Sequence, residues 1–368
     1  MKILVTGSRG FLGKNLVFRL RERGYTDIVE FHKDSTFSEL RQIICDVDFV
    51  FHLAGVNRPR DVHEFTTGNV EFTERLLKEL GRYGDKVPIV ISSSIHAENS
   101  SPYGESKARS EQAVFNYRDQ FDARVYVYRL PNIFGKWCKP NYNSAVATFC
   151  YNIANDLPVE IHDKDAALAL VYVDDVCDSF ISLLEKDPYE ERIAVSPVYQ
   201  CTVGDVVSML QQFKAGRDTL TVEEVGVGFS RALYSTYLSY LTPDKFCYDI
   251  PVYGDERGVF SEMIKTSTSG QISFFTARPG VTRGGHYHHS KNEKFLVIKG
   301  KARFKFEHII TEQKHCLEVD DRKLSIVETV PGWSHDITNI GDEEMIVMLW
   351  ANEIFDKNMP DTYARPLT

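Results

Sequence analysis

The chain begins with a short apolar run, a turn rich in glycine and then a helical pattern. Residues 3–5 are apolar without polar alternation, as expected for a strand buried on both faces of a parallel sheet. Gly7, Gly10 and Gly13 punctuate the turn, and apolar side chains then recur at helical spacing up to Gly24. Glycines permit a tight turn and close approach of the backbone to a ligand, and the helix N-terminus attracts negative charge. This arrangement favours a turn that binds the pyrophosphate of a dinucleotide over an ordinary strand-to-helix connection.

Length and composition predict a protein of two domains that does not bind nucleic acid. With 368 residues the chain is too long for one ordinary core. The net charge of −9, without a cluster of Lys and Arg, argues against a nucleic-acid partner. Seven cysteines without a CxxC pair indicate reduced thiols, and no apolar run approaches the ~18 residues of a membrane span. We therefore expect a cytoplasmic protein with no signal peptide and no membrane insertion.

The end of the second predicted strand carries cations. In an enzyme that binds NAD, this place should hold an acidic residue that contacts the ribose 2′-hydroxyl group. Here His32 and Lys33 stand there, and Arg9 adds a cation within the glycine turn. A 2′-phosphate would meet positive charge, so we expect NADPH to be the preferred cofactor. Asp34 and Asp46 remain as acids that could serve NAD instead.

Two further buried strands precede a candidate acid–base pair. The run at residues 49–55 ends in Ala54 and a glycine, where a cofactor could pass close to the backbone, and the run at 87–94 ends in three serines. Tyr103 and Lys107 follow at i and i+4, on one face of a predicted helix. A nearby ammonium favours the phenolate and lowers a pKa that is ordinarily about 10. Tyr103 could then transfer a proton, although such a pair also occurs as an ordinary surface contact.

The order and spacing of the glycine turn, the serines and the Tyr–Lys pair resemble the extended short-chain dehydrogenase/reductase family, over roughly residues 1–245. The resemblance implies a Rossmann-type parallel sheet in an α/β domain and activity on a nucleotide sugar. It also implies that Ser94 and Tyr103 bind the carbonyl or hydroxyl oxygen of the substrate. Lys107 would tune Tyr103 and hold the nicotinamide ribose. Ser93 could take the place of Ser94, because three serines stand in a row.

Two later segments extend this resemblance. Residues 129–135 are similar to the segment after the fifth strand of the family, which implies that Asn132 contacts the nucleotide-sugar substrate. Residues 171–176 resemble the strand and helix start that close the substrate lobe. His96 and Ala97 replace the Tyr-Gly that usually follows the serines, and this departure falls on the sugar pocket.

The helical pattern stops at residues 242–251, which have prolines near both ends. Short runs of alternating apolar and polar residues follow, separated by glycine and polar turns. Such strands indicate an all-β sandwich or jelly roll. We therefore predict one domain at residues 1–245 and a second at residues 253–368.

A group of histidines marks the second predicted domain. His286 and His288 are two residues apart and would project from the same face of a strand. Glu293 lies just beyond, and His335 comes from a separate strand. Three imidazoles and a carboxylate are a suitable ligand set for one divalent metal, with zinc the expected ion. The same histidines could instead form hydrogen bonds in a sugar pocket without a metal.

The second predicted domain resembles the cupin family over about residues 253–368. The matching residues are Gly280, His286, His288, Glu293 and Gly300 in the first motif, and Pro331, Gly332, His335 and Asn339 in the core of the second. In many cupins the positions of the three histidines and the glutamate are metal ligands. The resemblance therefore implies a metal bound by His286, His288, Glu293 and His335.

Two segments, residues 255–262 and 283–287, also resemble the metal-independent 4-keto-sugar 3,5-epimerases, which are cupins. In that subfamily the position of His286 is the general base, and the resemblance implies that Arg283 and Lys294 contact the sugar. One histidine is not expected to bind a metal and to remove a proton from carbon at the same time. If His286 binds the metal, the candidate bases are His335, Tyr287 and Lys294.

A reductase domain followed by a sugar-epimerase cupin resembles the bifunctional enzymes of capsule polysaccharide biosynthesis. This resemblance implies a UDP-linked 4-keto-6-deoxy-N-acetylhexosamine that is epimerised at C3 and reduced at C4 with NADPH, toward UDP-N-acetyl-L-fucosamine. The chemistry agrees, because a ketone at C4 acidifies the C3 proton and reduction destroys that ketone. Epimerisation must therefore come first.

Two alternatives are kept beside this interpretation. In the first, the chain is a single-function nucleotide-sugar reductase or epimerase whose cupin serves as a structural module for dimerisation. In the second, it is a nucleotide sensor built on a reductase fold, a class that usually lacks the Tyr–Lys pair. The chain is expected to form a homodimer.

Overall fold

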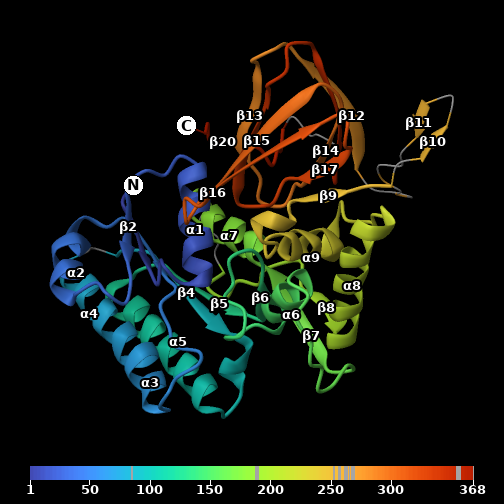
Figure 1. Ribbon diagram of the computed structural model, residues 1–368. Coiled ribbons are helices and arrows are strands. Elements are labelled where there is room, and N and C mark those ends of the chain that lie inside the picture. The colour runs from blue at the N-terminus through green and yellow to red at the C-terminus, as the bar shows by residue number, and fades with distance from the viewer. Residues whose placement is uncertain are drawn as a thin grey trace. The chain divides into compact units, whose positions relative to one another are not determined.

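The structure is a computed structural model that describes residues 1–83, 86–186, 190–251, 253–255, 258–260, 264, 266, 270–353 and 358–367. It divides into two compact units, which are Met1–Ser144 with Leu168–Gln200, and Ala145–Ala167 with Cys201–Thr368. Helices α6 (Ala145–Ala154), α8 (Val203–Thr219) and α9 (Gly228–Leu238) therefore group with the C-terminal strands (Figure 1). The sequence-based boundary between residues 245 and 253 stays a prediction.

A five-stranded parallel sheet with the order β2-β1-β3-β4-β5 forms the centre of the first unit. Its strands are β1 (Ile3–Thr6), β2 (Ile28–Phe31), β3 (Phe49–His52), β4 (Ile89–Ser94) and β5 (Val125–Leu130). The strand order reverses between β1 and β3, and ligands of such sheets bind at the carboxyl ends of the strands on either side of this reversal. The predicted glycine turn and Ala54 follow these two strands directly. The predicted Rossmann-type sheet is thus confirmed.

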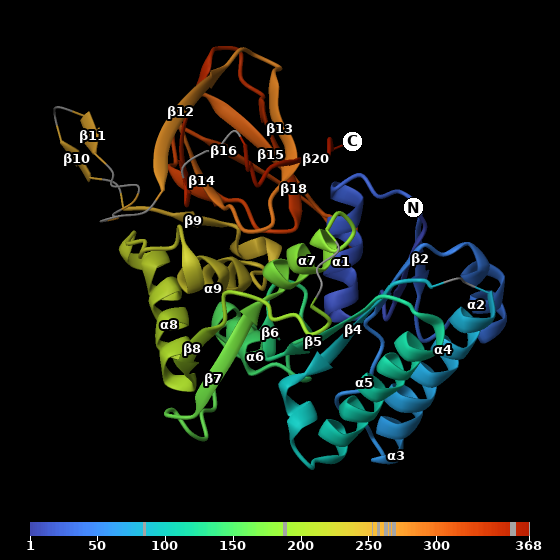
Figure 2. The same cartoon turned by 180° about the vertical axis from the view of Figure 1, so that it is seen from behind.

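Helices cover both faces of this sheet, as Figures 1 and 2 show. They are α1 (Phe11–Glu22), α2 (Phe37–Ile43), α3 (His63–Phe65), α4 (Phe72–Tyr83), α5 (Pro102–Phe121) and α7 (Val173–Ser182), with short 3-10 turns η1 (Ile44–Asp46) and η3 (Ile95–Glu98) and a π-helix η2 (Thr66–Glu71). Leu76 of α4 and Val114 of α5 pack with Val50 of β3 in one core cluster. Phe180 of α7 stacks on Phe51 of β3 with ring centroids 5.9 Å apart, and it belongs to the other face. Both faces of the sheet are therefore buried, which explains why the strand sequences are apolar without polar alternation.

Three shorter strands follow the main sheet, namely β6 (Asn132–Phe134), β7 (Ala167–Tyr172) and β8 (Tyr199–Thr202). β6 and β7 are parallel, with Asn132 opposite Leu170. The end of β6, where Phe134 is opposite Tyr172, is therefore held beside the start of α7, because β7 runs directly into that helix.

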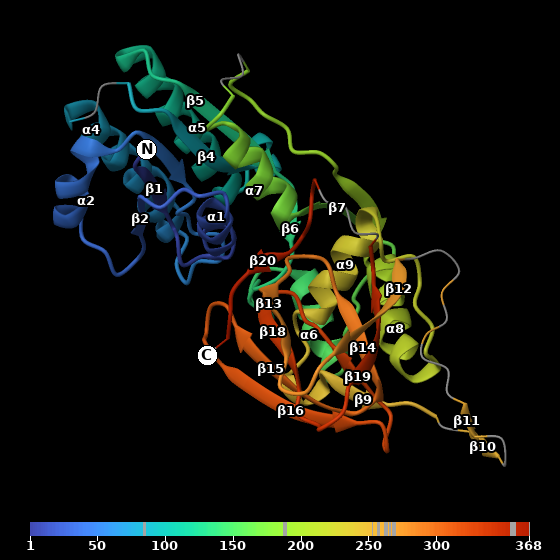
Figure 3. The ribbon, with the colours of Figure 1, turned by 90° about the horizontal axis from the view of Figure 1, so that it is seen from above.

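The second unit contains two five-stranded antiparallel sheets, with the orders β12-β19-β14-β17-β9 and β16-β15-β18-β13-β20 (Figure 3). The strands are β9 (Cys247–Asp249), β12 (Gln271–Ala277), β13 (Thr282–Tyr287), β14 (Glu293–Lys299), β15 (Lys301–His308), β16 (Lys314–Asp320), β17 (Ser325–Glu328), β18 (Trp333–Asn339), β19 (Met345–Ala351) and β20 (Tyr363–Ala364). Phe295 of the first sheet packs on Phe304 of the second, with ring centroids 5.7 Å apart. The predicted all-β fold of the C-terminal region is therefore confirmed.

The keto-sugar motif predicted at residues 255–262 falls only partly within the described residues. Strands β10 (Tyr253–Asp255) and β11 (Gly258–Phe260) pair in an antiparallel hairpin. Glu256, Arg257, Ser261 and Glu262 lie outside the described residues. None of the helices in the described part of the chain has the length and apolar character that crossing a membrane requires.

Candidate functional site

The glycine turn forms a cradle of bare backbone at the carboxyl ends of β1 and β3. Gly7 has φ +69°, and a Cβ placed there would lie 2.7 Å from the backbone nitrogen of Ala54. A Cβ on Gly13 would lie 2.2 Å from the carbonyl oxygen of Gly7. Both contacts are with backbone atoms, so a residue with a side chain at either position would force the turn to shift. Gly10 caps α1, and the first turn of that helix carries no acidic residue. The cradle therefore fits the pyrophosphate of a dinucleotide.

Two of the three residues predicted at the ribose end of this cradle lie beside a carboxylate. Arg9 Nη1 lies 3.1 Å from Asp34 Oδ2, and His32 Nδ1 lies 3.6 Å from the same oxygen. Lys33 is exposed beside them. The structure thus brings Arg9 and His32 together at Asp34, whose carboxylate partly offsets the charge of Arg9.

Three of the predicted catalytic residues meet at the end of β4. The Tyr103 phenol forms a side-chain hydrogen bond with Ser94. Lys107 Nζ donates to the carbonyl oxygen of Ser92 at 2.9 Å and lies 5.9 Å from the centre of the Tyr103 ring. Ser93 Oγ instead donates to Glu111 at 2.5 Å. Of the two serines that the sequence left open, Ser94 is therefore the one beside Tyr103.

The pKa values at this end of β4 differ in part from the expectation. Burial raises the pKa of the Tyr103 phenol, and the hydrogen bond with Ser94 offsets this only in part. The spacing predicts that Lys107 lowers this pKa, whereas in the structure burial of the phenol raises it. Burial also lowers the pKa of Lys107 to about 8, against the opposing effect of Glu111. Lys107 therefore loses its proton within a range accessible to enzyme assays.

Asn69 is a site residue that the sequence analysis did not single out. It lies in the π-helix η2, and its Oδ1 accepts from the backbone nitrogen of Val56 at 2.6 Å. Its Nδ2 donates to the carbonyl oxygen of Val56 at 3.0 Å and to Ser106 Oγ at 2.9 Å. Asn69 thus ties the segment after β3 to α5, the helix that carries Tyr103 and Lys107. Nothing in the local sequence distinguishes it from an ordinary helical Asn.

The predicted substrate contact Asn132 is exposed at the start of β6. The preceding β5 is anchored by Arg129, whose Nη2 lies 2.7 Å from Glu111 Oε2 and whose Nη1 lies 2.8 Å from Glu98. Glu111 also accepts the hydrogen bond of Ser93. This buried carboxylate therefore connects β4, α5 and β5 directly behind the candidate catalytic residues.

The four predicted metal ligands come together in the second unit. One ligand atom from each of His286, His288, Glu293 and His335 can be chosen so that all lie within 4.8 Å of one another. His286 is opposite His335 in the register of β13 and β18, and Glu293 opens β14. A bulge in β13, between residues 284 and 286, produces this pairing. Gly284 and Gly285 have φ +99° and +74°, which explains the double glycine before the histidines.

The charges in this cluster suit a metal. His288 Nε2 lies 3.3 Å from Glu293 Oε2, and His335 Nε2 lies 3.5 Å from the same oxygen. Burial, together with the neighbouring His335 and His288, lowers the pKa of His286 to about 3. Burial would raise the pKa of Glu293, but the neighbouring His288 and His335 hold it well below its usual range. Neutral imidazoles and an ionised carboxylate are the forms that bind a metal.

One buried nitrogen gives a further test of this fit. Among the described residues, His335 Nε2 is buried without a partner that meets hydrogen-bond geometry. Buried polar atoms usually have a partner, and an unsatisfied one needs an explanation. A divalent ion among the four ligand atoms would supply that partner. The residues present therefore fit a metal with nitrogen and oxygen ligands.

The structure does not bring Lys294 to this cluster. Lys294 follows Glu293 on β14 and so projects from the opposite face of the strand. Its ammonium forms an ion pair with Glu328 and lies 3.0 Å from the hydroxyl of Tyr248. Arg283 donates from Nη1 to the carbonyl oxygen of Thr276 at 2.7 Å. Lys294, which the sequence predicted as a sugar contact, is thus buried in an ion-pair network apart from the histidine cluster.

The other two candidate bases lie in different surroundings. His335 is part of the ligand cluster itself. Tyr287 is buried, and its ring stacks on that of Tyr363 with centroids 5.5 Å apart.

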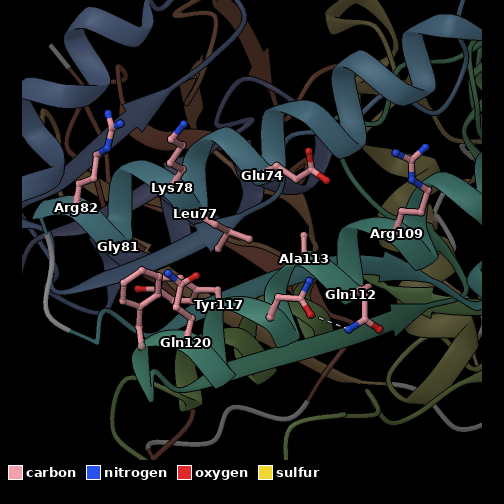
Figure 4. A pocket seen from close by; sticks show the side chains of 12 residues that line it. Glu74, Leu77, Lys78, Gly81, Arg82, Arg109, Gln112, Ala113, Tyr117 and Gln120 are labelled. Atoms are coloured by element: carbon pink, nitrogen blue, oxygen red, sulfur yellow. Dashed lines mark hydrogen bonds between the residues drawn. The ribbon is translucent and has the colours of Figure 1, made fainter.

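A groove of about 500 Å³ lies between α4 and α5 and contains none of the predicted site residues (Figure 4). Its rim carries Lys78, Arg82, Arg109 and Glu74, and its floor includes Leu77. Because its charged side chains are exposed and of mixed sign, the groove shows no chemistry comparable to the two clusters described above.

Comparison with known proteins matches both parts of the chain. Residues 3–195 match the NAD dependent epimerase/dehydratase family, and residues 253–363 match the polysaccharide biosynthesis C-terminal domain. The chain is 52% identical to the UDP-2-acetamido-2,6-beta-L-arabino-hexul-4-ose reductase of Pseudomonas aeruginosa, over 99% of this chain and 98% of that protein.

Solved structures resemble the whole chain or a part of it. The capsular polysaccharide assembling protein CapF from Staphylococcus aureus is 42% identical, with a TM-score of 0.69 and 100% of both chains covered. The UDP-glucuronic acid 4-epimerase from Bacillus cereus, at 20% identity and a TM-score of 0.53, covers 58% of this chain and 83% of its own. That second likeness concerns the fold alone. The predicted resemblance to capsule polysaccharide enzymes is confirmed by the first.

Proposed function

Because the chain belongs to the NAD dependent epimerase/dehydratase family, we propose that it reduces the C4 ketone of a UDP-linked 4-keto-6-deoxy amino sugar, and that its β domain epimerises C3 of that sugar. The 52% identical relative is named as a reductase of a UDP-linked hexul-4-ose, which supports the first activity. The main observation in favour of reductase activity is that Ser94, Tyr103 and Lys107 lie close together at the end of β4. The main observation in favour of epimerase activity is the cluster of His286, His288, Glu293 and His335.

In the reductase, Tyr103 provides the proton that the new hydroxyl group needs. A bound nicotinamide cofactor supplies the hydride to C4. Ser94 and Tyr103 hydrogen-bond the carbonyl oxygen, and the phenolic proton passes to that oxygen as negative charge develops on it. The Lys107 ammonium stabilises the tyrosinate that is left. With a pKa of about 8, Lys107 is charged at neutral pH and can do so.

We propose NADPH as the preferred cofactor, held by Gly7, Gly10, Gly13, Ala54 and Lys107, with Arg9, His32 and Lys33 at the 2′ position. The support is the position of Arg9 and His32, whose side-chain nitrogens lie 3.1 and 3.6 Å from Asp34 Oδ2. A 2′-phosphate would compete with the Asp34 carboxylate for Arg9 and His32. The preference should therefore be smaller than that of a site without an acidic residue.

In the β domain, we propose that His286, His288, Glu293 and His335 hold one divalent metal, with zinc the expected ion. The ion would act as a Lewis acid that polarises a carbonyl oxygen of the substrate. A base then removes the C3 proton, which the neighbouring C4 ketone has acidified, and a proton returns from the other face. His286 is the least buried of the four residues and is the base if it does not bind the metal.

The order of the two reactions follows from the substrate. Epimerisation needs the ketone, and reduction consumes it. The β domain must therefore act first, and the use of NADPH would draw an unfavourable ratio of epimers forward. The proposed product is UDP-N-acetyl-L-fucosamine, for a capsular polysaccharide.

The experiment is an incubation of the full chain with UDP-4-keto-6-deoxy-GlcNAc in deuterated buffer, with NADPH or NADH, read by NMR. We expect deuterium at C3 without a cofactor, and a reduced C4 carrying hydrogen once NADPH is added. A substrate that is reduced without any exchange at C3 would contradict the epimerase. A substrate that is not reduced with either cofactor would contradict the reductase.

A second candidate function keeps the reductase and makes the β domain a dimerisation module. The observation that favours it is a pair of exposed apolar side chains on one face of β12, Ile272 and Phe274, which are 53% and 70% exposed. We expect a homodimer in either case. Light scattering of the Phe274→Ser variant tests this surface, and a dimer that survives unchanged would rule it out. A monomeric variant with full exchange at C3 would separate dimerisation from epimerase chemistry.

A further inference from the structure

The last described segment of the chain, residues 358–367, lies against the strands that carry the histidine cluster (Figure 3). β20 pairs with β13 so that Ala364 is opposite His286 and Tyr363 is opposite Tyr287. The backbone nitrogen of Arg365 donates to the carbonyl oxygen of Gly285 at 2.8 Å. Ser334 Oγ, next to His335, donates to the carbonyl oxygen of Arg365 at 2.6 Å. This segment therefore touches two of the strands that present metal ligands.

Asp361 makes most of the contacts between this segment and the loop that joins His288 to Glu293. Its carboxylate accepts from the backbone nitrogens of His289 at 2.9 Å and of Ser290 and Lys291 at 2.6 Å each. It also accepts from Ser290 Oγ at 3.0 Å. Three backbone donors that converge on one carboxylate fix both the loop and the residue that supplies the carboxylate.

The backbone of Asp361 acts on a ligand directly. Its carbonyl oxygen accepts a hydrogen bond from Nδ1 of His288. A carbonyl oxygen can only accept, so the proton of the neutral imidazole is on Nδ1 and the lone pair is on Nε2. That Nε2 lies 3.3 Å from Glu293 Oε2, inside the ligand cluster.

We propose that Asp361 is a positioning residue of the metal site, which holds His288 in the tautomer and orientation that the metal needs. The inference rests on the metal site of the proposed function. The carboxylate anchors the segment on the loop, and the anchored carbonyl then orients the imidazole. Partners of this kind raise the affinity of a metal site without touching the metal.

The same anchor reaches a second ligand. Lys291, whose backbone nitrogen binds Asp361, places its Nζ 3.5 Å from Glu293 Oε1 and 3.5 Å from Thr362 Oγ1. Ser290 is held from the other side by Ser235 of α9, whose Oγ donates to the Ser290 carbonyl oxygen at 2.7 Å. The loop is thus fixed between α9 and the C-terminal segment. Asp361 provides the contact with the C-terminal segment, and the contact with α9 does not depend on it.

The test compares Asp361→Ala and Asp361→Asn with the exposed control Asp342→Ala in the full chain. Zinc affinity is measured by competition with a chromophoric chelator. We expect Asp361→Ala to bind zinc ~10–100-fold more weakly, as for other partners of a ligating histidine. Asp361→Asn keeps one acceptor oxygen and should lose less. The control should match the wild type. Equal zinc affinity in all four proteins would overturn the inference.

A second readout separates this inference from the metal assignment. Amide hydrogen exchange at residues 289–291 in metal-free protein should be faster in Asp361→Ala than in the wild type, with the rest of the β domain unchanged. A wild-type chain that binds no zinc would overturn the proposed metal. In that case the role of Asp361 is decided by this exchange, and unchanged rates would reject it.

Discussion

Arg217 connects a helix of the second unit to its β sheet, and its removal tests how that unit is built. Arg217 of α8 forms an ion pair with Glu328 of β17, donates to the carbonyl oxygen of Lys245 and lies 4.4 Å from the centre of the Tyr248 ring. Glu328 also pairs with Lys294 of β14. The side chains of Arg217, Glu328 and Lys294 are 13%, 1% and 4% exposed, so the network is buried.

Removal of one member of a buried ion pair costs ~3–5 kcal/mol, because the other charge is left behind without its partner. In Arg217→Ala, Glu328 keeps Lys294. Burial and then the charge of Arg217 lower the pKa of the Lys294 ammonium, so the substitution also removes one obstacle to its protonation. The cost should therefore be at the lower end, about 3 kcal/mol. For a unit of this size each kcal/mol shifts the melting temperature by ~2–4 °C, which gives a loss of about 6–12 °C.

The assay is a thermal scan with amide hydrogen exchange of β14 and β17. The matched control is Arg303→Ala, which removes an exposed ion pair with Glu318. Arg303 Nη2 lies 2.8 Å from Glu318 Oε1, and the two side chains are 44% and 37% exposed. That pair should contribute ~0–1 kcal/mol. If Arg217→Ala melts like Arg303→Ala and leaves exchange in β14 and β17 unchanged, α8 is not an integral part of the β unit, and the simple division at residues 245–253 would be favoured.

Three further predictions concern the proposed cofactor and metal. Arg9→Ala should narrow the preference for NADPH over NADH in kcat/KM, because one charge-assisted contact to the 2′-phosphate is lost; equal values for both cofactors in the wild type would refute the preference. The reductase kcat/KM should fall as pH rises through about 8, because Lys107 is protonated below that pKa and neutral above it, and an active Lys107→Arg variant should lack this decline. Removal of metal by a chelator should lower the stability of the second unit more than that of the first, because the ligands join separate strands; hydrogen exchange that rises equally in both units would speak against the metal site.

The features that the sequence predicted well depend on local pattern. The apolar run before Gly7 indicated a strand buried on both faces. Gly13 was recognised from the spacing of the glycines, and the structure gives the reason for it, because a Cβ there would lie 2.2 Å from the Gly7 carbonyl oxygen. The histidines at 286 and 288 share a face, as the period of a strand requires. The same period could have shown that Lys294, next to Glu293, faces away from the cluster.

The features that the sequence could not supply depend on contacts between distant segments. Asn69 acts through the backbone of Val56, and Asp361 acts through the backbone of residues 289–291 and the ring of His288. No local sequence motif predicts such contacts. The direction of the Tyr103 pKa shift depends on how deeply the phenol is buried, which the spacing of Tyr103 and Lys107 does not reveal. The grouping of α8 with the β sheets likewise involves contacts such as the ion pair of Arg217 with Glu328, which are 111 positions apart in the chain.

The central claim is that reduction and epimerisation use separate groups of residues. The most direct measurement is deuterium uptake at C3 of the 4-keto sugar, together with NADPH oxidation, in Tyr103→Phe and in Glu293→Ala. Tyr103→Phe removes the proton donor and should slow reduction by ~10²–10⁴-fold, while exchange at C3 continues. Glu293→Ala, like His335→Ala, should stop exchange at C3, while reduction of substrate supplied as the correct epimer continues. A folded Tyr103→Phe protein that loses both exchange and NADPH oxidation would contradict the claim and indicate one active site.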